Sequence, residues 1–148
     1  MIYRCLILAL ITVFAPATQN QIAQEVHARV NQYRKAQGLS PLKAKKELNA
    51  IAFRHSQAMA AGKVPFSHQG FDQRVEEVKA YAKKDWRVAE NLYASYYRQD
   101  IGRLALKDWR ESPGHKENLE GRFIFTGIGV ARSAKGEIFI TQLYVGRR

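Results

Sequence analysis

The sequence has one cysteine, Cys5, among its 148 residues. A lone cysteine cannot form an internal disulfide, so packing has to stabilise the folded chain. The sequence also lacks an apolar run of the ~20 residues that a membrane-spanning helix requires. The longest run, "CLILALITVFA", begins at Cys5 and ends at Ala15. Its length argues against a membrane span, and the rest of the chain is long enough for one domain with a hydrophobic core.

The short apolar run has the flanks of a secretory signal peptide. "MIYR" supplies a positive end before it, and the small residues Ala15 and Ala17 follow it on either side of Pro16. We therefore predict a signal peptide at residues 1–17 and a single domain at residues 18–148. An uncleaved membrane anchor is the alternative. Cleavage after Ala17 would remove the only cysteine, which suits a bacterial protein that is secreted or periplasmic.

Acidic residues are scarce. The chain has 13 Asp and Glu against 24 Lys and Arg, a formal net charge of +11. The basic residues are scattered and form no continuous run, and an exported protein seldom meets nucleic acid. The charge thus favours an anionic envelope component, such as lipid head groups or acidic glycans, as partner. A solvated basic surface with no specific partner is the alternative interpretation.

The spacing of apolar residues predicts an α+β domain. Helical stripes are followed by two strand-like runs that "SAKG" joins, with Gly136 as the turn residue. Such an order is typical of helices packed on a small antiparallel sheet. His55 lies on the apolar stripe of one helix, where a hydrogen-bonded core histidine is the expected role. The segments expected to be helical span residues 21–37, 48–59, 71–84 and 101–109; part of 86–97 is expected to be extended, and the hairpin covers 123–146.

No local motif identifies a reaction. The sequence contains no H-E-x-x-H, C-x-x-C, G-x-S-x-G or P-loop pattern. A site therefore has to be assembled from distant segments. His68 in "PFSHQGF" and His115 in "SPGHKEN" are both expected in loops, beside turn residues. Loops between rigid elements are where binding residues concentrate, which makes both histidines candidates.

Glu90 is a third candidate, because its neighbours in "VAENLY" are mostly apolar. A partly buried carboxylate needs a partner, since desolvation disfavours its charge. A histidine could be that partner, and two histidines with a glutamate could hold a divalent metal or act as an acid and base. Alternatively, Glu90 accepts from a backbone amide or pairs with a lysine.

Five segments in order resemble the CAP superfamily, which contains cysteine-rich secretory proteins, antigen 5 and plant pathogenesis-related proteins. They are "VNQYRKAQGLSPLKAKKELNAIAFRHSQAMA", "FSHQGF", "AENLYASY", "DWRESPGHKENLEGRFIFTGIGVA" and "GEIFITQLYV". Each segment is loosely diagnostic, but together they span almost the whole predicted domain. The chain is most similar to the cysteine-free bacterial branch. The resemblance implies an α-β-α sandwich with a small antiparallel sheet between helical layers.

The resemblance also implies a cleft triad of His68, Glu90 and His115. The family's second acidic position corresponds here to Ser112, and Glu111 lies one residue earlier. One residue turns a helical side chain by about 100°, so we expect Glu111 to point away and Ser112 to accompany the triad. Either residue is a candidate fourth member.

Three functions remain open from the sequence. The first is a secreted binding module that holds a lipid, a glycan or another envelope ligand in the His/Glu cleft. The second is a hydrolase or peptidase in which His68 and His115 hold zinc or another divalent cation and Glu90 acts on its water. Two histidines are half of a closed zinc shell, so such a site would be open and weak. The third is an interaction or toxic protein that acts on another cell.

Overall fold

The computed structural model describes residues 17–82 and 85–147. The predicted signal peptide lies, except for Ala17, outside the described residues, and it stays a prediction. Within the described ranges, no helix combines the length and the apolar character needed to cross a membrane.

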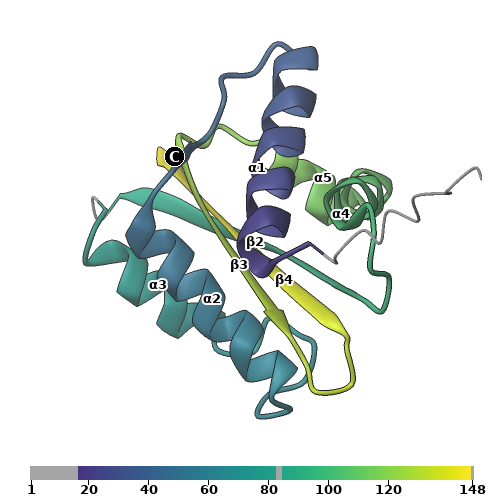
Figure 1. Cartoon of the computed structure of the whole chain (residues 1–148). Helices are drawn as coiled ribbons and strands as arrows, with labels where there is room; N and C mark the ends of the chain where they lie inside the picture. The colour runs from purple at the N-terminus through teal and green to yellow at the C-terminus, as the bar shows by residue number, and fades with distance from the viewer. Residues whose placement is uncertain (1–16, 83–84, 148) are drawn as a thin grey trace, which may run out of the picture.

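The described chain forms helices and strands in the order α1, β1, α2, α3, β2, α4, α5, β3, β4 (Figure 1). The strands form one sheet in the order β1-β3-β4-β2, so β2 and the greater part of β3 are its edges. The elements are α1 (Gln19–Ala36), β1 (Lys43–Ala44), α2 (Lys46–Ala60), α3 (Phe71–Lys79), β2 (Trp86–Ser95), α4 (Ile101–Glu111), α5 (Pro113–Glu120), β3 (Phe125–Arg132) and β4 (Ile138–Arg147).

Helices cover both faces of the sheet. Apolar side chains of α1, α4 and α5 pack on one face, around the fully buried Trp109. Leu48 and Ile51 of α2 and Val78 of α3 pack on the other face, against Leu143 of β4. Figure 1 shows α2 and α3 on one side of the strands and α1, α4 and α5 on the other. The predicted α-β-α sandwich is confirmed.

The prediction of an antiparallel sheet is confirmed for β2, β3 and β4 and is wrong for β1. The two residues of β1 pair with β3 in parallel, through bonds from Lys43 N to Ile124 O and from Lys45 N to Thr126 O. The sheet is therefore mixed. A strand of two residues is too short to show alternation, which explains why the sequence pattern did not predict it.

Two glycines let α2 lie directly on β3. A Cβ atom at Gly127 would fall 2.2 Å from the carbonyl carbon of Leu48, and one at Gly129 would fall 2.1 Å from the backbone nitrogen of Phe53. No side chain fits in such a space. The alternation of the strand then directs Ile128 and Val130 to the opposite face, where they join the core under α1.

The expectation of a loop around His115 is wrong, because residues 113–120 form helix α5. Pro113 does not break this helix but occupies its first turn, where its missing N–H has no intrahelical partner to lose. Ser112 separates α4 from α5 in an extended conformation. His115 consequently lies in the first turn of a helix rather than in a flexible connection.

Candidate functional site

The carboxylate of Glu90 is the centre of a buried polar network beside strand β2. Its side chain is only 1% exposed. Arg74 of α3 donates to both carboxylate oxygens, from Nε to Oε2 at 2.7 Å and from Nη2 to Oε1 at 2.7 Å. His68 donates from Nδ1 to Oε1 at 2.8 Å. Glu90 therefore has two charged or polar partners, a bidentate arginine and a histidine, and the arginine is the stronger.

His55 of α2 extends the network below Arg74. Nη1 of Arg74 donates to Nδ1 of His55 at 3.2 Å, and Nε2 of His55 donates to the carbonyl of Ser67 at 2.9 Å. These contacts require a neutral ring with its proton on Nε2. Burial lowers the pKa of His55, and repulsion from Arg74 lowers it further, while Glu90 partly offsets both. The expected role of a hydrogen-bonded core histidine agrees with this geometry.

Helix α3 and the loop before it place His68 and Arg74 together. Gly70 has a φ of 77°, a left-handed conformation that glycine adopts without strain, and it leads the chain into α3. Nη1 of Arg74 also donates to the carbonyl of Gln69 at 3.0 Å. One guanidinium thus holds Glu90, His55 and the loop of His68 in a fixed arrangement. His68 itself remains accessible, with 53% of its side chain exposed.

On the other side of β2, two asparagines attach helix α5 to the strand. Asn118 donates to the carbonyl of Glu90 at 3.2 Å and to Oδ1 of Asn91 at 2.9 Å. Asn91 donates to the carbonyl of His115 at 3.1 Å and to the hydroxyl of Tyr144 at 3.2 Å. The backbone of His115 is therefore fixed against β2 by amide side chains.

The imidazole of His115 is much less well satisfied than its backbone. Its Nδ1 atom is buried and has no hydrogen-bond partner among the described residues. Burial lowers the pKa of His115; Asp108 partly opposes this, and the proximity of His68 lowers it further. Burial therefore favours the neutral form of the ring. No hydrogen bond between described atoms connects this ring to Glu90, so its part in a triad stays a prediction.

The two candidates for a fourth member differ in position. Glu111 at the end of α4 has a side chain that is 63% exposed and pairs with Lys107 at 3.0 Å. It lines a separate groove with basic residues of α1 and α4. Ser112 lies between α4 and α5, and within the described structure its hydroxyl makes no hydrogen bond that would activate it. Neither side chain is bound to Glu90 or to His68.

The residues around Glu90 do not fit a complete metal centre. Among residues 17–82 and 85–147, no three His, Cys, Asp or Glu side chains are grouped as metal ligands. Both oxygens of Glu90 already accept from Arg74, and Nδ1 of His68 is bound to Glu90. The possible metal ligands that remain are Nε2 of His68 and one ring nitrogen of His115. They are fewer than the three protein ligands typical of catalytic zinc.

A groove of about 600 Å³ borders the exposed ring of His68. Its lining combines hydrogen-bonding groups with one aromatic ring, and it consists of His68, Gly70, Phe71, Asp72, Gln73, Glu76 and Glu77. Glu77 pairs with Arg54, and Glu76 pairs with Lys79 at 2.7 Å. Asp72 and Gln73 are free of such pairs within the described part of the chain. This groove can offer acceptors and donors to a ligand that reaches His68.

Sequence reasoning missed Arg74, which controls the site. It lies three residues after Phe71 and four before Val78, and so it belongs to the apolar stripe of α3. The signal that could have identified Arg74 was a charged residue on a buried helical stripe, in a chain that also has a candidate buried carboxylate. Asn91 gave no such signal, because an asparagine in a strand has no characteristic spacing.

Comparison with known proteins agrees with the α-β-α sandwich. The pattern of the Cysteine-rich secretory protein family (CAP) matches residues 27–144. The chain belongs to this family. No curated protein matches the sequence.

Several solved bacterial structures are similar. An outer surface protein from Borrelia burgdorferi has 16% identity and a TM-score of 0.71, over 90% of this chain and 98% of that chain. An extracellular protein with an SCP domain from Bacillus anthracis has 26% identity and a TM-score of 0.70, over 91% of this chain and 45% of that one. A cysteine-rich secretory protein from Staphylococcus aureus has 21% identity and a TM-score of 0.67, over 86% and 39%. This chain thus spans less than half of the last two.

Proposed function

We propose that the protein is a secreted CAP domain that binds a glycan of the cell envelope in the groove beside His68. The observation that carries the proposal is the lining of that groove. A phenyl ring, an imidazole, a carboxamide and carboxylates surround about 600 Å³ of accessible space. Sugars match such a lining, because their hydroxyls exchange hydrogen bonds with polar groups and their ring faces pack on an aromatic ring.

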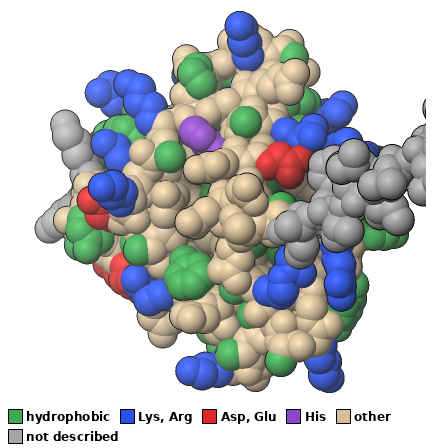
Figure 2. Space-filling model, in the orientation of Figure 1, with side chains coloured by type: hydrophobic (Ala, Val, Ile, Leu, Met, Phe, Trp, Pro, Cys, Tyr) green, Lys and Arg blue, Asp and Glu red, His purple; other side chains and the backbone are tan. Residues whose placement is uncertain are grey.

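The charges of the groove favour a glycan over an anionic lipid. Asp72, Glu76 and Glu77 give it an acidic rim in a chain of net charge +11. The rest of the basic surface would attract the protein to an anionic envelope in general, and that attraction is not specific for a site. Figure 2 shows Lys and Arg side chains spread around the periphery of the visible face rather than gathered over one element.

Hydrolysis has less support. In the metal-dependent mechanism Glu90 would be the base, but Arg74 already donates a hydrogen bond to each of its carboxylate oxygens. Ser112 has no hydrogen-bonded base among the described residues, which a serine nucleophile needs. A rigid network with one exposed imidazole is better suited to orient a ligand than to react with it. The extracellular relatives support export, and we propose that residues 1–17 direct it.

Sedimentation with purified peptidoglycan tests the proposal, with vesicles of anionic phospholipid as the comparison. We expect the protein to sediment with peptidoglycan at 0.5 M NaCl, where screening suppresses general charge attraction. His68→Ala and Gln73→Ala should each weaken this binding several-fold. Gln57→Ala, an exposed carboxamide change on α2, is the matched control. Binding that salt abolishes, or that the His68 variant retains in full, would overturn the glycan proposal.

A further inference from the structure

The outer edge of β3 is largely free of pairing strands. β1 covers only Phe125 and Thr126. The next backbone donor along this edge, the N–H of Ile128, is bound by the side chain of Asn49 at 2.9 Å. From that point to the end of β3 at Arg132, no described strand pairs with this side.

The alternation of an antiparallel pair shows which backbone groups face outward. The carbonyl of Thr126 accepts from Lys45, and the N–H of Ile128 turns to Asn49, so both point away from β4. Residues two apart in a strand share this direction. Val130 therefore directs its N–H and C=O to the outer edge. Neither group has a hydrogen-bond partner on that side within the described residues.

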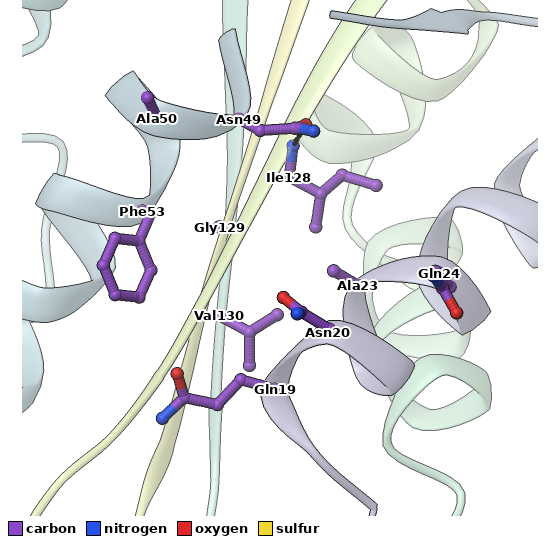
Figure 3. Close-up of a pocket in the computed structure, with 10 residues that line it drawn as sticks. All are labelled: Gln19, Asn20, Ala23, Gln24, Asn49, Ala50, Phe53, Ile128, Gly129 and Val130. Carbon is purple, nitrogen blue, oxygen red and sulfur yellow. Dashed lines mark hydrogen bonds between the residues drawn. The ribbon is translucent and has the colours of Figure 1, made fainter. Parts of the chain in front are cut away.

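A trench of about 380 Å³ leads to these groups between α1 and α2 (Figure 3). Figure 3 shows Gln19 and Asn20 of α1 on one side and Phe53 of α2 on the other, with β3 between them. No charged residue lines the trench, although the chain is strongly basic. The lining consists of Gln19, Asn20, Ala23, Gln24, Asn49, Ala50, Phe53, Ile128, Gly129 and Val130.

We propose that this trench binds an extended, uncharged peptide segment of a partner protein, which adds to β3 as a further strand. An extended peptide offers N–H and C=O groups at the spacing of the free groups of β3. Besides Asn49, three carboxamides of α1 line the trench, and they can donate to and accept from the outer groups of the same peptide; they are those of Gln19, Asn20 and Gln24. Phe53, 38% exposed, provides an apolar contact for its side chains.

The depth of the trench decides between a single strand and a second copy of the chain. Ile128 and Val130 are 7% and 3% exposed, so the edge lies below the surfaces of α1 and α2. A second sheet would bring its own flanking helices against these two helices, whereas one extended segment would bring none. At ~3.3 Å per residue, the open edge from Ile128 to Arg132 matches a partner segment of about five residues. This site lies on the opposite sheet edge from His68 and does not depend on the proposed glycan binding.

Selection from a display library of random twelve-residue linear peptides provides the probe. Peptides that bind the protein are synthesised, and their contacts are mapped by amide exchange and chemical shifts in NMR. We expect bound peptides to slow exchange at the Val130 amide, which in the free protein should exchange faster than the amides of Gly129 and Ala131. N-methylation at alternate peptide positions should abolish binding for one alternate set only, the set that faces β3.

A matched pair of alanine variants tests the location. Ala50 and Ala28 are exposed alanines on α2 and α1, and only Ala50 lines the trench. Ala50→Trp fills the trench and should weaken peptide binding at least tenfold, whereas Ala28→Trp should leave it unchanged. The proposal is overturned if no peptide is selected, if the selected peptides protect amides elsewhere, or if N-methylation at either set has the same effect.

Discussion

The two edges of the sheet differ in how their outward backbone groups are bound. An edge strand exposes backbone groups that need partners. At β2, Asn118 donates to the carbonyl of Glu90, and Trp109 donates from Nε1 to the carbonyl of Leu92 at 2.8 Å. At β3, beyond the two residues of β1, Asn49 is the side chain that binds an outward group. Side chains thus bind two outward carbonyls of β2, whereas, in the described part of the chain, Val130 of β3 keeps both of its outward backbone groups unbound beside a trench.

The β2 edge carries a rigid network of side chains, whereas the β3 edge carries backbone groups that are available to a partner. The β2 edge carries Glu90, whose carboxylate accepts hydrogen bonds from Arg74 and His68. The position of the carboxylate is therefore set before a ligand binds. Preorganisation of this kind orients a ligand at little entropic cost. The β3 edge instead keeps unbound backbone groups, whose natural partner is another backbone. A single small domain can therefore present two different modes of recognition on its two sheet edges.

The largest expected effect on stability comes from substitution of Arg74, the partner of Glu90 beside the β2 edge. Arg74→Met would leave the carboxylate of Glu90, 1% exposed, without its bidentate partner. Removal of one member of a buried pair typically costs about 3–5 kcal/mol of the free energy of unfolding. Urea denaturation followed by circular dichroism measures the loss. The matched control, Arg87→Met, removes an arginine whose side chain is 42% exposed, and it should change stability little.

The double variant Arg74→Met/Glu90→Gln separates a lost pair from lost packing. Glutamine can still accept from His68 and carries no charge to bury, so the double variant should recover at least half of the loss. A double variant as unstable as Arg74→Met alone would show that packing of the arginine, and not its pairing, stabilises this edge. A loss below about 1 kcal/mol in the single variant would contradict the prediction itself.

A smaller effect compares the asparagines that bind the two edges. Asn118→Ala leaves the carbonyl of Glu90 and the amide oxygen of Asn91 without their donor, at a cost of about 2 kcal/mol. Asn49→Ala frees the N–H of Ile128, which water can reach through the trench, and should cost less than about 1 kcal/mol. Thermal and urea unfolding of both variants measure the difference. Equal losses of stability would mean that water cannot replace the side-chain partner at the β3 edge any better than at the β2 edge.

How far the sequence predicts this molecule depends on the range of each interaction. The helical stripes of α1 and α2 and the hairpin of β3 and β4 are local patterns, and they were recognisable. The proximity of His68 and Glu90 was expected only through the resemblance to a family, because 22 residues separate them. Arg74 was missed because an arginine in a helix is usually solvated, although its place on the apolar stripe of α3 was a signal in the spacing. The pairing of β1 with β3 arises from tertiary packing and has no sequence signal. The same holds for which outward backbone groups of β2 and β3 have partners.

The smallest expected effect is a pH dependence of stability, which arises from the buried histidines His55 and His115 on either side of β2. Burial lowers the pKa of His55 and of His115 below the ordinary value of 6.5, so the unfolded chain takes up these protons first. The stability associated with the neutral rings is thus fully present above pH 6.5. It is lost as the pH falls from 6.5 through the lower folded-state values. Urea denaturation between pH 5 and 7.5 should show this decline.

Variants and direct titration assign the decline to the two rings. His55→Gln retains a donor for the carbonyl of Ser67 and removes the titrating group, so it should flatten the decline. His115→Gln should flatten it independently, because the rings belong to different layers, α2 and α5. NMR titration of the two imidazoles should give midpoints below 6.5. Midpoints above 6.5 would reverse the sign of the linkage and would mean that these histidines are stabilised as cations beside β2.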